Sequence, residues 1–358
     1  MRKNVFVLLL IFVVLTGCQA HQPNSTIRKG TKENHTFDDI KSLHTQDSTA
    51  IGDWYDKDHV LVIDKKDNEY EVNRYNLYSG QSSSFFKTSN QVMSIKRSPD
   101  SKMFLLQTSL SEEKIELSIL NRKGELQKRF SFPAYEVEYN WNSFDENRIV
   151  VTTFSKDWSF DVYALNIETG EKKHLSTNQP FVQWMSKTNI AYLDNKDLMN
   201  NEAPLVKEDI ETSKKNALSK KGLMFSNDQK YLLVLRYDRD QEGYGTYTFY
   251  DRKNQKVREF QVPLLSDYSG WSVPYYGWDS RQHVFYTYKP KYSTNKASYN
   301  EEFMLVGFSL ETGQENKIAS LKEEKPIRLS PDGKYALLGL SGKKIVDLKT
   351  GETKSLIK

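Results

Sequence analysis

The chain has 358 residues and carries 51 lysines and arginines against 47 aspartates and glutamates, for a formal net charge of +4. A net charge this small predicts no basic face, so we expect no nucleic-acid partner. The single cysteine excludes an internal disulfide framework, and no motif of a zinc protease, a nucleotide-binding loop or a serine hydrolase occurs, so we expect neither a metal nor a cofactor.

The N-terminus has the pattern of a secretory signal. Arg2 and Lys3 precede an unbroken apolar run from Val5 to Leu15. These eleven residues are too few to span a bilayer as a helix, which takes roughly twenty, but they suit the apolar region of a signal peptide. Removal of residues 1–17 takes away two of the 51 basic residues and leaves 49 against 47 acidic ones, a net charge of +2.

The apolar run ends at Leu15-Thr16-Gly17-Cys18, which resembles the lipobox of bacterial lipoproteins. The resemblance implies cleavage after Gly17, thioether-linked diacylglycerol on Cys18 and, in many bacteria, a further N-linked acyl chain. Two or more chains give stable anchoring where one is marginal. We therefore expect fatty acids such as palmitate on Cys18 to hold the protein on the extracytoplasmic face of the cell membrane. The alternative is an ordinary signal peptide followed by an incidental cysteine.

Residues 18–50 are polar and lack periodicity, which predicts a flexible tether. About thirty residues of random coil reach on the order of 30 Å. Phe37, Ile40 and Leu43 recur at helical spacing within this stretch. Thr36–His44 therefore has two interpretations, as part of the tether or as a short helix docked on the rest of the protein.

From residue 51 onward two phrases alternate. The first is a turn followed by a short apolar run, as in SPDGKYALLGL from Ser330, and consecutive apolar residues predict a strand covered on both faces. The second is an alternating strand that ends in a tight turn, as in YALNIETGE from Tyr163. Such turns need one residue at positive φ. These turn residues are Gly80, Gly124, Gly170, Ser213, Asn254, Gly313 and Gly351.

Two phrases in fixed order, repeated about every 40 to 50 residues, are typical of the four-stranded blades of a β-propeller. The sequence therefore predicts an all-β fold, a β-propeller of four-stranded antiparallel blades, over residues 51–358. A β-sandwich would not repeat its turn chemistry at this interval. The count favours seven blades, and an irregular fourth unit leaves six open. The units begin near Ile51, Gln91, Glu136, Pro180, Gly222, Trp271 and Lys325.

Bulky aromatic residues recur at the end of five of the seven predicted first strands, where they are expected to pack blade against blade. They are Trp54, Trp141, Trp184, Phe225 and Trp278. His59 and His283 share one repeat position, just before the second strand, and are better explained as polar strand starters than as metal ligands.

The long connections of a propeller of this kind would all open on one face, between second and third strands and between successive blades. They are the ranges 155–160, 236–245, 264–276 and 289–301. Binding usually resides in loops on a rigid scaffold, and Tyr and Trp are enriched at recognition sites. We predict a surface there for an envelope protein or a polysaccharide, formed by Trp158, Tyr244, Trp271, Tyr275, Tyr276 and Tyr292. The alternative is that these aromatics cover the core beneath their own loops.

An enzyme is the second functional interpretation. A lactonase-like or glycan-cleaving propeller needs carboxylates that converge on the central funnel. The predicted first strands offer only Asp53, Glu136 and Glu138, which are scattered. We therefore assign no catalytic residue.

The SPDGK phrase at Ser330 and the ETGE phrase at Glu168 are similar to the repeats of TolB-like and WD40-like propellers. Together with the lipobox and the tether, they resemble the YqgU-like propeller lipoproteins of bacilli. The resemblance implies a six-bladed propeller at the membrane and supplies no activity. We therefore expect a monomeric, lipid-anchored binding or scaffold module of the cell envelope, with an accessory to a neighbouring envelope enzyme as a third interpretation.

Overall fold

The structure, a computed structural model, describes residues 35–44, 49–195, 202–268 and 270–358. The predicted signal peptide, the lipobox and most of the predicted tether lie outside these ranges, so the predictions for Leu15, Thr16, Gly17 and Cys18 stay predictions. Phe37–Lys358 form one compact unit.

The unit contains seven four-stranded antiparallel sheets within the described residues, each ordered as in the sequence. The first contains β1 (Ala50–Trp54), β2 (His59–Lys66), β3 (Glu69–Asn76) and β4 (Ser82–Thr88). The second contains β5 (Gln91–Arg97), β6 (Met103–Ser111), β7 (Lys114–Asn121) and β8 (Leu126–Pro133). The third contains β9 (Glu136–Trp141), β10 (Arg148–Phe154), β11 (Phe160–Asn166) and β12 (Lys172–Leu175).

The fourth sheet contains β13 (Gln183–Trp184), β14 (Asn189–Leu193), β15 (Ala203–Asp209) and β16 (Lys215–Gly222). The fifth contains β17 (Met224–Asn227), β18 (Leu232–Tyr237), β19 (Tyr244–Tyr250) and β20 (Lys256–Pro263). The sixth contains β23 (Tyr276–Asp279), β24 (Val284–Lys289), β26 (Phe303–Ser309) and β27 (Glu315–Leu321). The seventh contains β28 (Ile327–Leu329), β29 (Tyr335–Leu338), β30 (Lys344–Asp347) and β31 (Thr353–Ser355).

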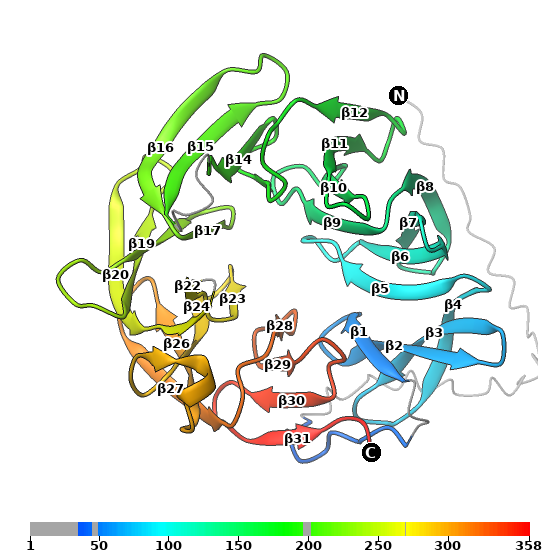
Figure 1. Cartoon of the computed structure of the whole chain (residues 1–358). Helices are drawn as coiled ribbons and strands as arrows, with labels where there is room; N and C mark the ends of the chain where they lie inside the picture. The colour runs from blue at the N-terminus through cyan, green and yellow to red at the C-terminus, as the bar shows by residue number, and fades with distance from the viewer. Residues whose placement is uncertain (1–34, 45–48, 196–201, 269) are drawn as a thin grey trace, which may run out of the picture. The chain divides into compact units, whose positions relative to one another are not determined.

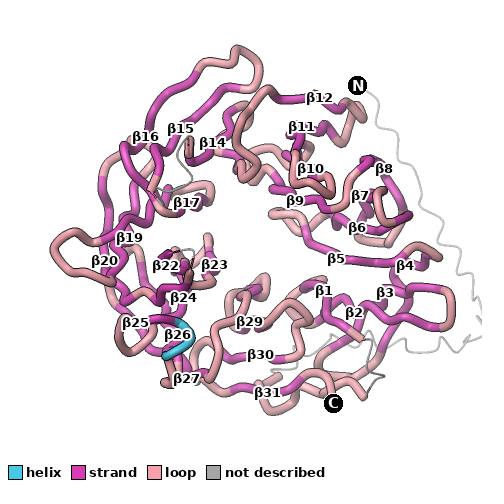
Figure 2. Tube along the Cα trace, in the orientation of Figure 1, coloured by secondary structure: helices cyan, strands magenta, loops and turns pink. Residues whose placement is uncertain are grey.

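The sheets stand around a common centre, with first strands such as β1, β5 and β9 innermost and fourth strands such as β8, β20 and β31 outermost (Figures 1 and 2). This arrangement confirms the predicted all-β propeller of four-stranded antiparallel sheets. Buried apolar clusters lie between each sheet and the next, and one more joins the seventh sheet to the first. The core is therefore divided among the sheet interfaces, which is why no sheet can bury its apolar faces alone.

Both local signals of the repeat take the predicted form. The second strands are buried on consecutive residues, as in Val60–Ile63 of β2 and Leu232–Leu235 of β18. The tight turns between third and fourth strands all place their marker residue at positive φ, from 58° at Ser213 to 81° at Gly124. Serine and asparagine therefore adopt the left-handed backbone where glycine is missing, which asparagine tolerates well.

The segment before β1 docks on the unit without forming a helix. Phe37, Ile40 and Leu43 are buried in the cluster between the seventh and first sheets. Their burial agrees with the interpretation that this segment docks on the rest of the protein. The predicted helix is wrong because the backbone pairs with its neighbours: the Leu43 N–H donates to the Leu356 carbonyl at 2.6 Å, and Leu43 forms a parallel bridge with Ile357. This segment covers the seam where the ring closes.

The sixth unit begins later than predicted. Trp271 lies outside the four-stranded sheet, whose first strand starts at Tyr276. The preceding loop forms its own small sheet of β21 (Leu265–Asp267), β22 (Gly270–Ser272) and β25 (Thr294–Asn295), followed by the 3-10 turn η1 (Lys296–Ser298). The prediction failed here because a loop that pairs with itself has the same residue alternation as a blade strand.

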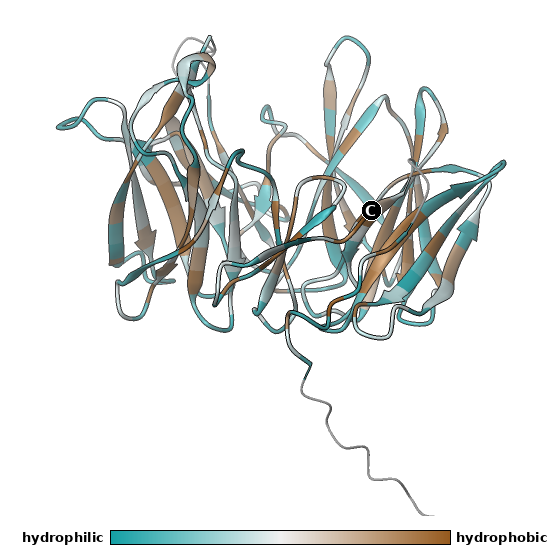
Figure 3. Cartoon of the chain, turned by 90° about the horizontal axis from the view of Figure 1, so that it is seen from below, coloured by the Kyte–Doolittle hydropathy of each residue, from teal (hydrophilic) through white to brown (hydrophobic). Residues whose placement is uncertain are grey.

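The strand order places the short turns on one side of the ring and the long connections on the other. We call the side with the short turns, such as 98–102, the short-turn face. We call the side with the long connections, such as 264–275, the long-loop face. Connections on one side reach further from the sheets than those on the other (Figure 3). The two faces therefore offer different surfaces to a partner.

Candidate functional site

The six predicted aromatic residues do not form one patch. Trp158 projects from the third sheet, in the turn between β10 and β11, whereas Tyr244 begins β19 of the fifth sheet. The other four belong to the sixth sheet and its loops: Trp271, Tyr275, Tyr276 and Tyr292. Two separate regions of the long-loop face must therefore be considered.

In the sixth-sheet region, two of the aromatics serve the packing of the loops. Tyr276 stacks on Phe285, with 5.7 Å between ring centroids, inside the cluster that joins the fifth and sixth sheets. Trp271 lies against Gly243, where an added Cβ would be 3.4 Å from the indole ring. Their placement supports the alternative that these rings cover the protein's own core. Tyr275 and Tyr292 are more exposed, and Tyr292 contacts the ring of Tyr299.

Trp158 differs because its side chain is 63% exposed although its backbone is strained. Its φ of 64° lies in the left-handed region, which costs an L-residue about 1–2 kcal/mol and which glycine or asparagine normally occupies in such hairpin turns. The ring meets Phe154 edge-on at 6.1 Å. A large aromatic held outward at a strained position is the kind of outlier from which function is inferred.

Two more exposed aromatic residues contact Phe154. Phe181 is 70% exposed and its ring lies 6.1 Å from Phe154, while the Tyr135 N–H donates to the Phe154 carbonyl at 2.8 Å and its side chain is 50% exposed. We call Tyr135, Trp158 and Phe181 the aromatic patch. Sequence analysis missed Tyr135 and Phe181 because they lie in short connections between sheets. Their signal was available, since both precede a first strand on the long-loop face.

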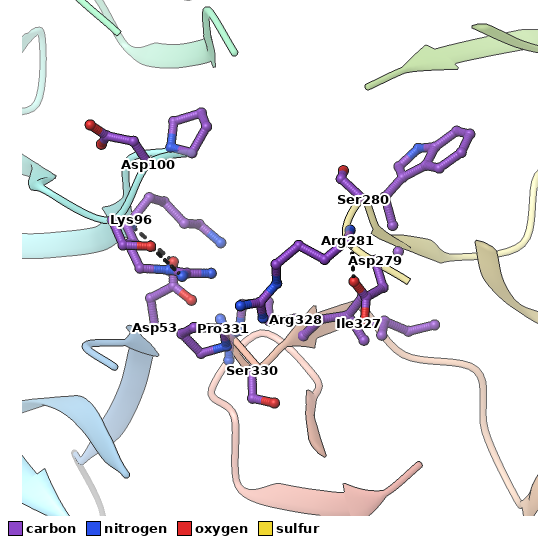
Figure 4. Close-up of a pocket in the computed structure, with 16 residues that line it drawn as sticks. Asp53, Lys96, Asp100, Asp279, Ser280, Arg281, Ile327, Arg328, Ser330 and Pro331 are labelled. Atoms are coloured by element: carbon purple, nitrogen blue, oxygen red, sulfur yellow. Dashed lines mark hydrogen bonds between the residues drawn. The ribbon is translucent and has the colours of Figure 1, made fainter. Parts of the chain in front are cut away.

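A pocket of about 540 Å³ opens on the short-turn face, near the centre of the ring. Four sheets contribute side chains to it. Asp53 lies near the end of β1, and Lys96 and Arg97 lie at the end of β5. Arg281 follows β23, and Arg328 lies in β28. Lys96 and Arg281 extend toward the middle of the pocket from opposite sides (Figure 4). The sixth, seventh, first and second sheets are neighbours around the ring, so the pocket straddles the seam.

Asp53, one of the three carboxylates considered for an enzyme, lies in this pocket among cations. Its Oδ1 accepts from the Trp54 N–H at 2.8 Å and its Oδ2 from the Arg97 N–H at 2.9 Å. Glu136 and Glu138 lie on β9 of the third sheet, and burial together with Glu136 raises the pKa of Glu138. Among the described residues no group of three or more His, Cys, Asp or Glu could hold a metal ion. The three carboxylates come from two sheets, Asp53 from the first and Glu136 and Glu138 from the third.

Sequence analysis also missed the basic residues of the pocket. Lys96 and Arg328 each lie two residues before the serine of an SPD turn, at Ser98 and Ser330. This shared repeat position was the signal that could have found them, because equivalent positions of a propeller meet around its centre.

Glu146 lies on the short-turn face in the turn before β10. Burial raises its pKa to about 7, and the nearby Asp100 carboxylate contributes in the same direction. Because the folded protein binds this proton more tightly than the unfolded chain does, the carboxylate destabilises the fold increasingly as pH rises from about 4.5 to about 7.

We expect Glu146→Gln to leave the melting temperature unchanged below pH 4.5 and to raise it progressively toward neutral pH. Thermal melts from pH 4 to pH 8 check this, with Glu168→Gln, an exposed carboxylate on a tight turn, as the control for the lost charge. An equal effect of Glu146→Gln at every pH would contradict the expectation.

Comparison with known proteins decides the family. Residues 76–339, which are 264 of the 358 residues, match the family described as "YqgU-like 6-bladed beta propeller domain". The chain belongs to this family. The YqgU-like region includes the second to sixth sheets whole and the first and seventh in part. The family description names six blades, where this chain has seven four-stranded sheets among its described residues.

A relative over the full length is "Uncharacterized lipoprotein YqgU" of Bacillus subtilis (strain 168). It is 26% identical over 360 residues, which cover all of this chain and 98% of that protein. A homologue of this YqgU-like chain is therefore a lipoprotein. In the described part of the chain, no helix has the length and apolar character to cross a bilayer.

Solved structures share the YqgU-like fold. The protein lmo1340 of Listeria monocytogenes EGD-e has a TM-score of 0.82 at 22% identity, covering 89% of this chain and 98% of that one. The β-propeller domain of the Trilobed protease from Pyrococcus furiosus, described as having an open velcro topology, has a TM-score of 0.54 at 14% identity, covering 87% and 98%. At these identities the likeness shows the fold alone.

Proposed function

We propose that this protein is a lipid-anchored binding module on the extracytoplasmic face of the cell membrane. The lipobox at Cys18 and the lipoprotein relative support the anchor. The proposal further assigns a monomeric propeller of seven blades, supported by the seven four-stranded sheets and by the apolar cluster that joins the last of them to the first. Replacing Cys18 by alanine should abolish labelling with an alkyne-tagged fatty acid; labelling that persists would refute attachment at this residue.

The aromatic patch is the surface that we propose for an envelope partner, a protein or a polysaccharide. The observation that carries this proposal is Trp158, an exposed indole kept at a left-handed backbone position. Interface hot spots are rich in tryptophan and tyrosine, and exposed apolar patches mark interaction sites. Phe154 contacts the rings of Trp158 and Phe181, and this contact reduces the side-chain freedom that the two rings lose when a partner binds.

We expect Trp158→Asn to weaken partner binding without destabilising the protein. Relief of about 1–2 kcal/mol of backbone strain is opposed by the loss of an edge contact worth about 0.5–1.5 kcal/mol. The free energy of unfolding should therefore stay the same or rise by up to about 1 kcal/mol. Loss of an anchoring tryptophan at a hot spot should reduce affinity more than tenfold.

Crosslinking on intact cells followed by mass spectrometry, with a parallel glycan analysis, measures the binding and separates the two partner classes. Tyr268→Ser is the matched control, because Tyr268 is a fully exposed aromatic in the sixth-sheet loops of the same face. Partner recovery that survives Trp158→Asn and falls with Tyr268→Ser would move the site to those loops. A Trp158→Asn variant that unfolds would contradict the strain argument instead.

A further inference from the structure

The pocket on the short-turn face carries an excess of positive charge. Its lining contains Lys96, Arg97, Arg281 and Arg328 against the carboxylates Asp53, Asp100 and Asp279. Asp100 is already paired with Lys102 outside the pocket, at 2.9 Å. Two carboxylates are therefore left to face four cations, and the pocket is suited to an anion.

Arg97 and Arg328 use only part of their guanidinium groups in hydrogen bonds within the described structure. Arg97 donates from Nη1 to the Ser101 hydroxyl at 2.6 Å. Arg328 donates to the carbonyls of Leu340 and Ile51, at 3.0 and 3.2 Å. The Nε atoms of both arginines are buried without a hydrogen-bond partner in the described structure. An unsatisfied buried donor on a charged group is costly, and an acceptor in the pocket would remove that penalty.

Within the described ranges neither Lys96 nor Arg281 forms an ion pair. Burial lowers the pKa of Lys96, and the nearby Arg328 lowers it further against the opposing effects of Asp53 and Glu138. Burial likewise lowers the pKa values of Arg97 and Arg328, each against Asp53. Asp53 thus faces three of the cations, with Glu138 acting on Lys96 as well, and the positive charge of the pocket is only partly compensated.

We propose that this pocket binds the phosphoryl group of a phosphate ester, held by Lys96, Arg97, Arg281 and Arg328. Arginine presents planar, paired donors that match the geometry of phosphate oxygens, and lysine adds a point charge. The volume of about 540 Å³ is larger than a phosphate ion and within the range of small-molecule sites, so the organic part of the ester also fits. The site lies on the face opposite the aromatic patch.

The position of the pocket is compatible with two sources of such an ester. The compact unit begins at Phe37, whose ring packs 5.6 Å from Tyr335 just beyond an SPD turn, on the face where the pocket opens. If Cys18 anchors the protein, as the proposed function holds, a lipid headgroup of that membrane is one source. A soluble phosphate ester is the other.

Ligand binding is expected to raise the melting temperature, because the four cations come from three sheets on both sides of the ring closure. The full chain, purified in non-ionic detergent, is melted with inorganic phosphate, with glycerol 3-phosphate, or with sodium chloride at matched ionic strength. At a ligand concentration a hundred times the Kd the expected rise is about 3–5 °C over chloride. Mixed micelles with phosphatidylglycerol, compared with phosphatidylcholine micelles, form the lipid arm.

The test variant is Lys96→Gln with Arg281→Gln, since neither side chain supports the fold through an ion pair. It should lose at least ten times in affinity for glycerol 3-phosphate. Lys230→Gln with Lys334→Gln is the matched control: it removes the same charge from the same kind of turn, outside the pocket lining. The control should bind within about a factor of two of the wild type.

Each outcome decides the proposal. A shift in the phosphatidylglycerol micelles alone assigns a lipid headgroup, and a shift with glycerol 3-phosphate assigns a soluble ester as sufficient. No shift in any arm, or an equal loss in the test and control variants, would overturn the site. The soluble arm does not depend on Cys18, so a protein that binds glycerol 3-phosphate but incorporates no fatty acid would refute the anchor and retain the pocket.

Discussion

Trp54→Ala is expected to lower the free energy of unfolding by about 3–5 kcal/mol, as for other large core aromatics. Trp54 is fully buried in the cluster between the seventh and first sheets. Its indole Nε1 donates to the Arg328 carbonyl at 2.9 Å, which links β1 to β28 across the seam. Among the described residues, every four-stranded sheet is built from strands that follow one another in the chain. Side-chain packing of this kind therefore closes the ring together with a few backbone hydrogen bonds across the seam, such as those from Leu43 to Leu356 and from Ile51 to Ser341.

A comparison with Trp184 separates packing from hydrogen bonding at this position. Trp184 occupies the matching place in the fourth sheet and is equally buried, but its Nε1 has no hydrogen-bond partner among the described residues. Trp54→Phe should consequently destabilise by about 1 kcal/mol more than Trp184→Phe, the usual net value of one hydrogen bond. Denaturant unfolding followed by circular dichroism measures all of these variants. A Trp54→Ala protein within about 1 kcal/mol of the wild type would show that the seam does not hold the ring together.

The second large effect is expected at a tight turn. Gly124→Ala should destabilise by about 2–4 kcal/mol, because φ is 81° there and an added Cβ would overlap the carbonyl oxygen of Phe85 in the neighbouring first sheet. Gly351 meets the Ile318 carbonyl of the sixth sheet in the same way. Glycine is therefore required at these two turns for two reasons: the backbone φ is positive, and the neighbouring sheet leaves no room for a Cβ.

Gly313→Ala is the matched control for this prediction. Its φ of 78° is similar, but the nearest neighbour of an added Cβ is the flexible Arg258 side chain at 3.3 Å. It should lose only the backbone component of about 1–2 kcal/mol. Urea or guanidinium melts of the two variants give the difference. Equal losses for Gly124→Ala and Gly313→Ala would rule out the close contact between sheets as the cause.

The local parts of this fold were predictable because they depend on neighbouring residues. Positive φ at Gly80 or Asn254 follows from the turn, and the burial of Val60–Ile63 follows from a consecutive apolar run. The docking of Phe37 and its neighbours was harder to predict. Their spacing left docking as one of two interpretations, and helical spacing does not reveal that the backbone partners are the carbonyls of Leu77 and Leu356.

The candidate sites were predicted less well, since they combine residues that the sequence keeps apart. Trp158 was proposed from its position in a loop, whereas Phe181 and Tyr135 join it only through the shared contact with Phe154. Asp53 was considered for catalysis because it is a carboxylate on a first strand. The structure surrounds it with cations from other sheets, which changes the chemistry that the pocket can perform.

By itself the sequence determined the repeat, the strands and the tight turns of this protein, together with the lipobox pattern at its start. These features arise from hydrogen bonds and side-chain alternation within about fifty residues, the length of one repeat. Only the tertiary structure decided how the ring closes and which charges meet at its centre. Sheets that lie at opposite ends of the chain become neighbours when the ring closes, so Lys96 and Arg328 share a pocket that no single repeat contains.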